Sequence, residues 1–224
     1  MKTISHQRLL VALLVSTAVS AEGLHAALLP PDASASVRPT ADGKIAKVFV
    51  EKPDEDETGS LHIVYHDGLD VVQIVPPKAE PKAEGSQAGF SEFKVARDQE
   101  SVGWGETYWE CCQSYPIPLV LTLYRSGSII RRIRQGQELW AWSFLDGGRK
   151  VATVWGLTHG PEVGDFQLYD VATGRMLAEV FGDEASQQLK SDAPNWAQDL
   201  QEELDKPARP LERVVFPPAD APDR

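Results

Sequence analysis

Short runs of alternating apolar and polar residues recur along most of the chain between residues 44 and 181. The runs are rich in β-branched and aromatic side chains. A period of two residues places successive side chains on opposite faces of a strand, so this pattern predicts β-strands rather than helices. The predicted strands are Lys47–Val50, Leu61–Tyr65, Val71–Val75, Ser101–Gly105, Leu119–Tyr124, Ser128–Ile133, Trp140–Phe144, Val151–Trp155, Phe166–Tyr169 and Met176–Phe181.

Glycine-containing turns separate several of these runs. Glycine readily adopts the positive φ that tight turns between antiparallel strands require. The chain is therefore expected to be mainly antiparallel β. The turns are His66-Asp67-Gly68, Arg125-Ser126-Gly127, Asp146-Gly147-Gly148 and Ala172-Thr173-Gly174.

Three segments depart from the strand pattern. Pro76–Ala88 contains three prolines with alternating Lys and Glu, which predicts a solvated linker or a long loop. Over residues 194–204 apolar side chains recur every four residues after Pro194, which predicts a short amphipathic C-terminal helix. The proline-rich tail, 206–224, is expected to be extended or disordered, with Val214–Phe216 able to dock on the body.

The strand and turn pattern also repeats within the chain. Phe144–Val151 has the same spacing as Val95–Val102, and the strand that follows each ends in tryptophan, at Trp155 and Trp104. A unit of four antiparallel strands is the blade of a β-propeller, but two to three blades are too few to close a ring. The predicted fold is thus mainly β, an open arrangement of two to three antiparallel propeller-like blades with the short C-terminal helix. The units are residues 44–75, 89–134 and 139–181, within a β domain of residues 44–205.

The first 21 residues have the order of regions found in secretory signal peptides. Lys2 and Arg8 precede an apolar run over Leu9–Val19, and small residues follow at Ser20 and Ala21. The run is shorter than the roughly 20 apolar residues needed to span a bilayer. We therefore expect cleavage after residue 20 or 21, an N-terminal extension over residues 22–43, and a periplasmic or secreted protein with no membrane association after cleavage.

The chain is acidic, with 22 lysine and arginine residues against 33 aspartate and glutamate residues, a net charge of −11. Loss of residues 1–21 removes Lys2 and Arg8 and brings the net charge to −13. Such a surface repels phosphate backbones and anionic lipid headgroups, so nucleic acid is not expected as a partner. The remaining length suffices for one domain with a hydrophobic core.

Residues 101–178 contain several short motifs that resemble known families. Trp142–Ala152 and Leu168–Arg175 resemble blades of WD40-like and TolB-like β-propellers. The segment as a whole resembles a family of short, exported and uncharacterised bacterial proteins, although Glu110 and Gln113 stand where that family usually has asparagine and threonine. The resemblance implies a blade-like fold and brings no known activity. The motifs that carry it are Val102-Gly-Trp104, Cys111-Cys-Gln-Ser-Tyr-Pro-Ile-Pro-Leu119, Gly147-Gly-Arg-Lys-Val-Ala152, Thr158-His-Gly160 and Asp170–Arg175.

Cys111 and Cys112 are adjacent and are the only cysteines in the chain. They can form a vicinal disulfide, remain two thiols, or bridge to another molecule. A vicinal ring is strained, because neighbouring Cα atoms lie about 3.8 Å apart and disulfides normally join Cα atoms at least about 4.4 Å apart. The pair therefore indicates either a rigid loop or a redox-sensitive switch, and Pro116 and Pro118 beside it favour a fixed loop.

Aromatic side chains are frequent around the cysteines. Tryptophan at a strand end usually packs between sheets, so Trp104 and the tryptophans of the next unit are assigned to the core. Tyr108, Trp109 and Tyr115 are predicted to lie in a loop instead, where such side chains can stack on a sugar ring or contact a peptide.

Chemistry-bearing motifs are otherwise sparse. His62 and His66 resemble a metal pair only on a helix, whereas the residues between them predict a strand, on which they would lie about 13 Å apart. His159 is a candidate ligand-binding residue with Asp146, Glu162 or Asp165 as its partner, although a histidine held by a backbone carbonyl is the simpler account. The sequence therefore assigns no catalytic residue, metal or cofactor, and we expect no enzymatic activity.

Three functional hypotheses follow. The first is an exported, non-enzymatic module that binds an unknown protein or glycan through the loop around Cys111–Tyr115. The second is a thiol-disulfide responsive sensor that uses the Cys111-Cys112 pair. The third is a minor hydrolase that uses Asp146 and His159, which requires the two side chains within hydrogen-bond reach.

Overall fold

The computed structural model describes residues 27–29, 43–51, 59–66, 71–74, 83–158, 164–182, 189–206 and 214–215. The expected signal peptide, His159, and most of the N-terminal extension and of the C-terminal tail lie outside these ranges. Within them the chain forms three antiparallel sheets and one α-helix, α1 (Asn195–Leu204).

The three sheets take most of their strands in sequence order. Sheet A has the order β1-β8-β7-β6-β5, sheet B the order β13-β2-β3-β4, and sheet C the order β12-β11-β10-β9. Their strands are, for sheet A, β1 (Ala27–Leu29), β5 (Gln87–Val95), β6 (Ser101–Tyr108), β7 (Ile117–Arg125) and β8 (Ser128–Arg134); for sheet B, β2 (Ile45–Val50), β3 (Leu61–Tyr65), β4 (Val71–Ile74) and β13 (Val214–Val215); and for sheet C, β9 (Glu138–Leu145), β10 (Lys150–Gly156), β11 (Asp165–Asp170) and β12 (Met176–Phe181).

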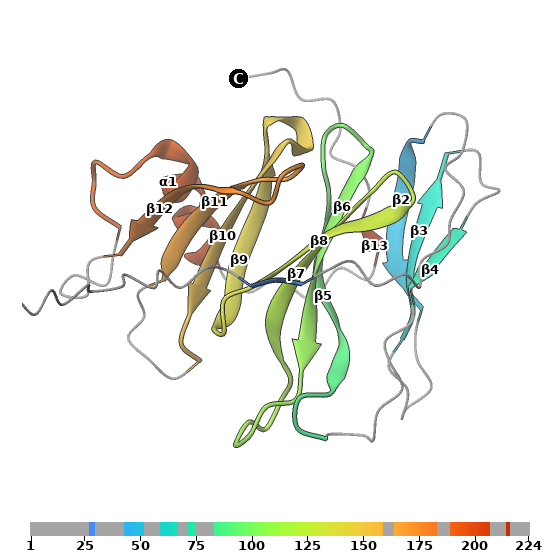
Figure 1. Cartoon of the computed structure of the whole chain (residues 1–224), viewed down its shortest axis with the longest axis horizontal. Coiled ribbons are helices and arrows are strands. Elements are labelled where there is room, and N and C mark those ends of the chain that lie inside the picture. The colour runs from blue at the N-terminus through green and yellow to red at the C-terminus, as the bar shows by residue number, and fades with distance from the viewer. Residues whose placement is uncertain are drawn as a thin grey trace, which may run out of the picture.

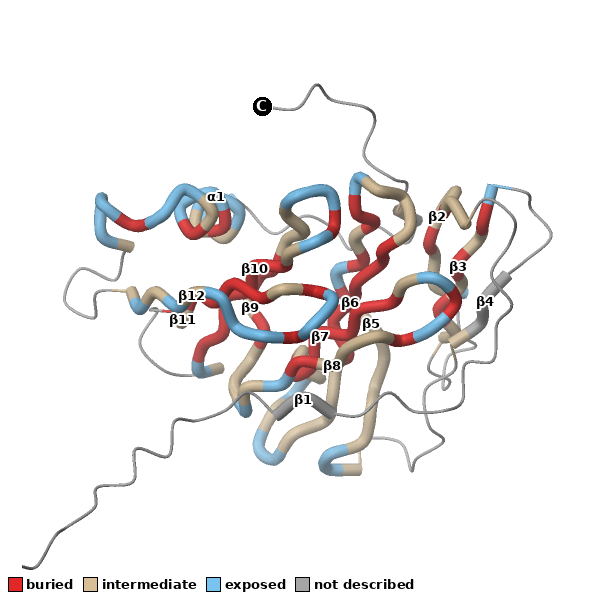
Figure 2. The backbone as a smooth tube through the Cα atoms, turned by 45° about the horizontal axis from the view of Figure 1, so that its top comes forward, coloured by how far each residue is buried: buried red, intermediate tan, exposed pale blue. Residues whose placement is uncertain are grey.

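The sheets stand side by side in a row, with sheet A between the other two (Figure 1). The buried residues lie in the layers between neighbouring sheets and between sheet C and α1, and the exposed residues gather at turns and on the rest of α1 (Figure 2). No sheet closes on itself among the described residues. The prediction of a mainly β, open arrangement with one short helix near the C-terminus is therefore confirmed.

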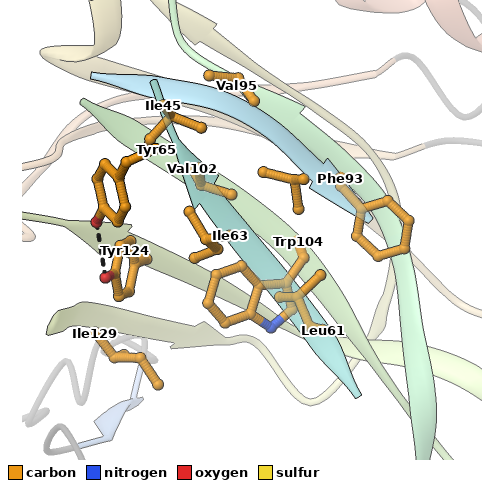
Figure 3. Close-up of a cluster of buried hydrophobic side chains, with 11 residues drawn as sticks. Ile45, Leu61, Ile63, Tyr65, Phe93, Val95, Val102, Trp104, Tyr124 and Ile129 are labelled. Atoms are coloured by element: carbon orange, nitrogen blue, oxygen red, sulfur yellow. Dashed lines mark hydrogen bonds between the residues drawn. The ribbon is translucent and has the colours of Figure 1, made fainter. Parts of the chain in front are cut away.

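Trp104 and Tyr124 on sheet A pack against sheet B. Trp104 is fully buried beside Leu61 and Ile63 of β3 (Figure 3). The hydroxyl oxygens of Tyr124 and Tyr65 form a hydrogen bond of 2.9 Å across this interface. Burial of large apolar side chains supplies most of the stabilising free energy of such a layer, and the two tyrosine hydroxyls satisfy each other within it.

The layer between sheets A and C is built around two further tryptophans, Trp142 and Trp155, which are also fully buried. Gly103 of β6 leaves room for the Trp142 ring, since a Cβ atom there would lie 2.5 Å from its Cη2 atom. The assignment of these tryptophans to the core therefore agrees with the structure, and the glycine before Trp104 has a steric reason.

The C-terminal part of the chain contacts all three sheets. Helix α1 packs on the face of sheet C that points away from sheet A, where Ala197 and Leu200 are buried. Near its end Glu203 forms an ion pair with Lys94 of sheet A, and Lys94 also donates to the backbone oxygen of Trp142 in sheet C. Farther along, β13 pairs with β2 and completes sheet B. Val214 and Val215, which the sequence suggested as able to dock on the body, are thus paired with β2.

Candidate functional site

The hairpin formed by β6 and β7 ends in residues 109–116, here termed the hairpin tip. Tyr108 and Ile117 are the last paired residues below it. The tip extends beyond the strand ends of the neighbouring sheets (Figure 1). Its base is held by the segment before β5, because Gly85 N–H donates to the Trp109 oxygen at 2.6 Å and Trp109 N–H donates to the Ser86 oxygen at 3.0 Å.

The two cysteines occupy the centre of a turn within the tip. Gln113 N–H donates to the Glu110 oxygen at 3.4 Å, which places Cys111 and Cys112 at the two middle positions. Cys112 has φ of +69°, a value that the second middle position of some turns requires and that side-chain-bearing residues rarely adopt. Both residues are exposed, and their Sγ atoms lie 2.6 Å apart.

Tyr115 is the most exposed aromatic side chain of the tip, at 52 %. Trp109 is half-buried, as are Glu110 and Gln113. The tip therefore presents an aromatic ring and two sulfur atoms on a short loop, of which the prediction from sequence named Trp109, Cys111, Cys112 and Tyr115.

Acidic groups surround the thiols. The pKa of Cys111 is raised above its usual value, chiefly by the hydrogen bond and charge interaction with Cys112, and further by the carboxylates of Glu84 and Glu110. Cys111 thus carries its proton at neutral pH. The same negative field opposes the approach of anions to the sulfur atoms.

Tyr108 differs from its predicted surface position. It is the last residue of β6 and is half-buried, with its hydroxyl donating to Glu106 Oε2 at 2.7 Å. The guanidinium of Arg134 lies over its ring, 6.0 Å from the centroid. Burial and the neighbouring Glu106 carboxylate raise the pKa of Tyr108. Because β6 continues three residues past Gly105 to pair with β7, Tyr108 supports the base of the tip.

Glu106 is a buried carboxylate that the sequence analysis did not single out. It also accepts hydrogen bonds from Thr122 Oγ1 at 2.6 Å and from Arg132 Nε at 3.1 Å. These partners come from β7 and β8, so the cluster joins three strands directly below the tip. The sequence offers one indication of this cluster: Glu106 is an acidic residue at a position that, by the two-residue alternation from Val102 and Trp104, faces the interior.

Asp146 lies in a single 3-10 turn, η1 (Asp146–Gly148), between β9 and β10. Its Oδ2 atom forms an ion pair of 2.7 Å with Lys150 at the start of β10, and this bond lowers the pKa of Asp146. His159 lies outside the described residues, and Thr158 before it follows the opposite end of β10. Thr158 and Asp146 therefore lie at opposite ends of β10.

The part of the chain that the structure describes contains neither a cluster of metal-ligating side chains nor a helix that could span a membrane. No three His, Cys, Asp or Glu side chains there converge as a metal ion would require. His62 lies on a strand as predicted, stacked on Phe49 with ring centroids 4.8 Å apart. Nor is any helix in these ranges long and apolar enough to cross a bilayer.

No protein-family model matches the chain, and none of the curated proteins is significantly similar to it.

Proposed function

We propose that the protein is an exported, non-enzymatic module that binds another protein through its hairpin tip. The observation that carries this proposal is the exposure of Tyr115, Cys111 and Cys112 together on one short loop. A tyrosine of this kind offers a large contact area with few rotatable bonds, so it loses little entropy on binding.

The base of the tip supports the same proposal. Trp109 is tied to the segment before β5 by two backbone hydrogen bonds, and Glu106 ties β6 to β7 and β8. A loop on such a base changes conformation little on binding, which lowers the entropic cost of association. Export and a periplasmic or secreted location remain part of the proposal and rest on residues 1–21.

A photo-crosslinking residue at Ser114, introduced into the full chain in the producing cell, tests the proposal. The matched control carries the same residue at Ala172, an exposed position in the turn between β11 and β12. We expect a discrete adduct of higher mass from position 114 only, and its loss on Tyr115→Ala. Equal adducts from both positions, or none from position 114, would contradict a binding role for the tip.

A glycan is the other ligand class that an exposed tyrosine suits. Binding of the purified chain to an array of immobilised glycans separates the two classes. Retention on one glycan type, abolished by Tyr115→Ala, together with no protein adduct at position 114, would replace the protein partner by a sugar.

A further inference from the structure

The Cys111 and Cys112 side chains form a pair whose geometry and surroundings select the reagent with which it reacts. We infer that the pair is a reversible dithiol site that closes to a vicinal disulfide by exchange with small-molecule disulfides, and that it reacts with cationic or neutral disulfides in preference to anionic ones.

The first support is the placement of the sulfur atoms. Successive side chains on a strand point to opposite faces. In the tip the positive φ of Cys112 breaks that alternation, and its sulfur lies beside that of Cys111. The two thiols are therefore already on the same side of the turn, and closure requires no movement of the strands below.

The second support is the exposure of the two cysteines and the absence of any other cysteine from the sequence. Both cysteines are exposed, so a reagent in solvent reaches either sulfur. The chain has no third cysteine, so the only thiol within the molecule that can resolve a mixed disulfide is the adjacent one. Because the adjacent thiol is held next to the bond that it attacks, this step has a high effective concentration.

The exchange balances as two substitutions at sulfur. A thiolate of one cysteine attacks the small disulfide, which forms a mixed disulfide and releases one small thiolate. The neighbouring thiolate then attacks the protein-bound sulfur, which closes the Cys111–Cys112 bond and releases the second small thiolate. Two electrons pass from the cysteines to the reagent, and the two cysteine protons are taken up through solvent by the released thiolates. Excess small thiol reverses both steps.

The charge preference follows from the carboxylates beside the pair. Glu110 precedes Cys111 directly, and Glu84 precedes Gly85, whose N–H donates to the Trp109 oxygen at the base of the tip. The whole chain has a net charge of −11, so the local and global fields have the same sign. Such a field raises the local concentration of cations and lowers that of anions, an effect that salt screens.

Intact-mass spectrometry of the reduced full chain tests the inference. Samples are treated with cystamine, which is cationic, with bis(2-hydroxyethyl) disulfide, which is neutral, or with oxidised glutathione, which is anionic, and are then alkylated. The expected product is a chain about 2 Da lighter that takes up no alkyl group. At low ionic strength we expect cystamine to react about tenfold faster than oxidised glutathione.

Two sets of variants serve as controls. Cys111→Ser and Cys112→Ser each retain one thiol and should stop at the mixed disulfide. The double variant Glu84→Gln with Glu110→Gln, or added salt, should bring the two rates together. A stable mixed disulfide or a disulfide-linked dimer as the main product of the unaltered chain would overturn the intramolecular ring, and equal rates at low salt would overturn the charge preference. The readout uses the isolated protein, so it does not depend on whether the tip binds a partner.

Discussion

At the scale of single residues, the best-supported feature is the buried Glu106 carboxylate with its three hydrogen-bond donors. A buried charge is stable only where charged and polar partners compensate for its lost hydration. Glu100 provides a natural comparison, because it also accepts from an arginine, Arg125, but is more than one-third exposed. Glu100 directly precedes β6 and is partly exposed, whereas Glu106 lies near the end of the same strand and is buried.

This comparison gives the first prediction. Glu106→Gln should lower the free energy of unfolding by about 3 kcal/mol, because it breaks a buried ion pair with Arg132. Glu100→Gln should cost less than about 1 kcal/mol, because exposed ion pairs contribute little. Urea denaturation of both variants measures the difference. Similar losses in the two variants would show that burial of Glu106 does not set its contribution.

Two aspartates at the ends of β11 give a prediction on pH. Burial raises the pKa of Asp165 above 3.8, whereas the side-chain and backbone groups of Thr173 lower that of Asp170. A raised carboxyl pKa means that the charged form is less favourable in the folded chain, so stability falls as pH rises through the interval between the unfolded and folded pKa values. A lowered pKa has the opposite sign, and its contribution is lost as pH falls through the folded pKa.

Asp165→Asn should therefore raise the urea midpoint at pH 7, and the gain should shrink toward zero as the pH falls to about 3. Asp170→Asn should lower the midpoint at pH 7, because Asp170 Oδ1 accepts from both Thr173 N–H and Thr173 Oγ1 at 2.7 Å. Equilibrium unfolding across pH follows both variants. Shifts of the same sign at pH 7 would be inconsistent with these assignments.

At the scale of elements, alternation in the sequence identified most strands, and two of its errors have clear physical causes. The strands β3 and β12 begin and end where predicted. The edge strand β5 of sheet A was missed because it begins at the end of the proline-rich segment Pro76–Ala88 and because a bulge between Ser91 and Lys94 interrupts its alternation. Strand β6 runs past its predicted end because its last residues pair with β7. The local sequence pattern of β6 carries no information about that pairing.

The residues of the hairpin tip could be predicted from the sequence, but the contacts at its base could not. Adjacent cysteines, prolines and Tyr115 made the loop a candidate from composition alone. The Glu106 cluster was not predictable, because Arg132 lies 26 residues away and reaches Glu106 only when β8 pairs with β7. The exposed residues of the tip could thus be predicted from the sequence, whereas the hydrogen bonds that hold its base depend on the order of the strands and could not.

At the scale of the whole molecule, the row of sheets is joined at its two ends by the last part of the chain. Helix α1 covers sheet C, and β13 occupies the edge of sheet B beside β2. The segment between them therefore links the two outer layers. Unpaired strand edges invite association with other chains, and β13 removes one such edge.

Truncation after Lys206 should therefore lower the free energy of unfolding by about 2 kcal/mol, because Val215 no longer packs against the layer between sheets A and B. The exposed edge of β2 should also increase self-association. Truncation after Phe216 is the matched control and should leave stability unchanged. Chemical denaturation and size-exclusion chromatography measure both effects, and equal stability of the two truncated chains would argue against a structural role for β13.

The central claim is that the hairpin tip acts in binding and is not required for folding. Tyr108 and Ile117 face each other as the last strand pair, so residues 109–116 can be replaced by Asn-Gly, a two-residue turn that suits such a hairpin. The decisive measurement compares this replacement chain with the unaltered chain in urea denaturation and in photo-crosslinking from a residue within β7, at half-buried Pro118. We predict a partner adduct from position 118 of the unaltered chain and none from the replacement chain, whose unfolding free energy stays within about 1 kcal/mol of that of the unaltered chain. A partner adduct that survives the replacement, or a chain that no longer folds, would contradict the claim.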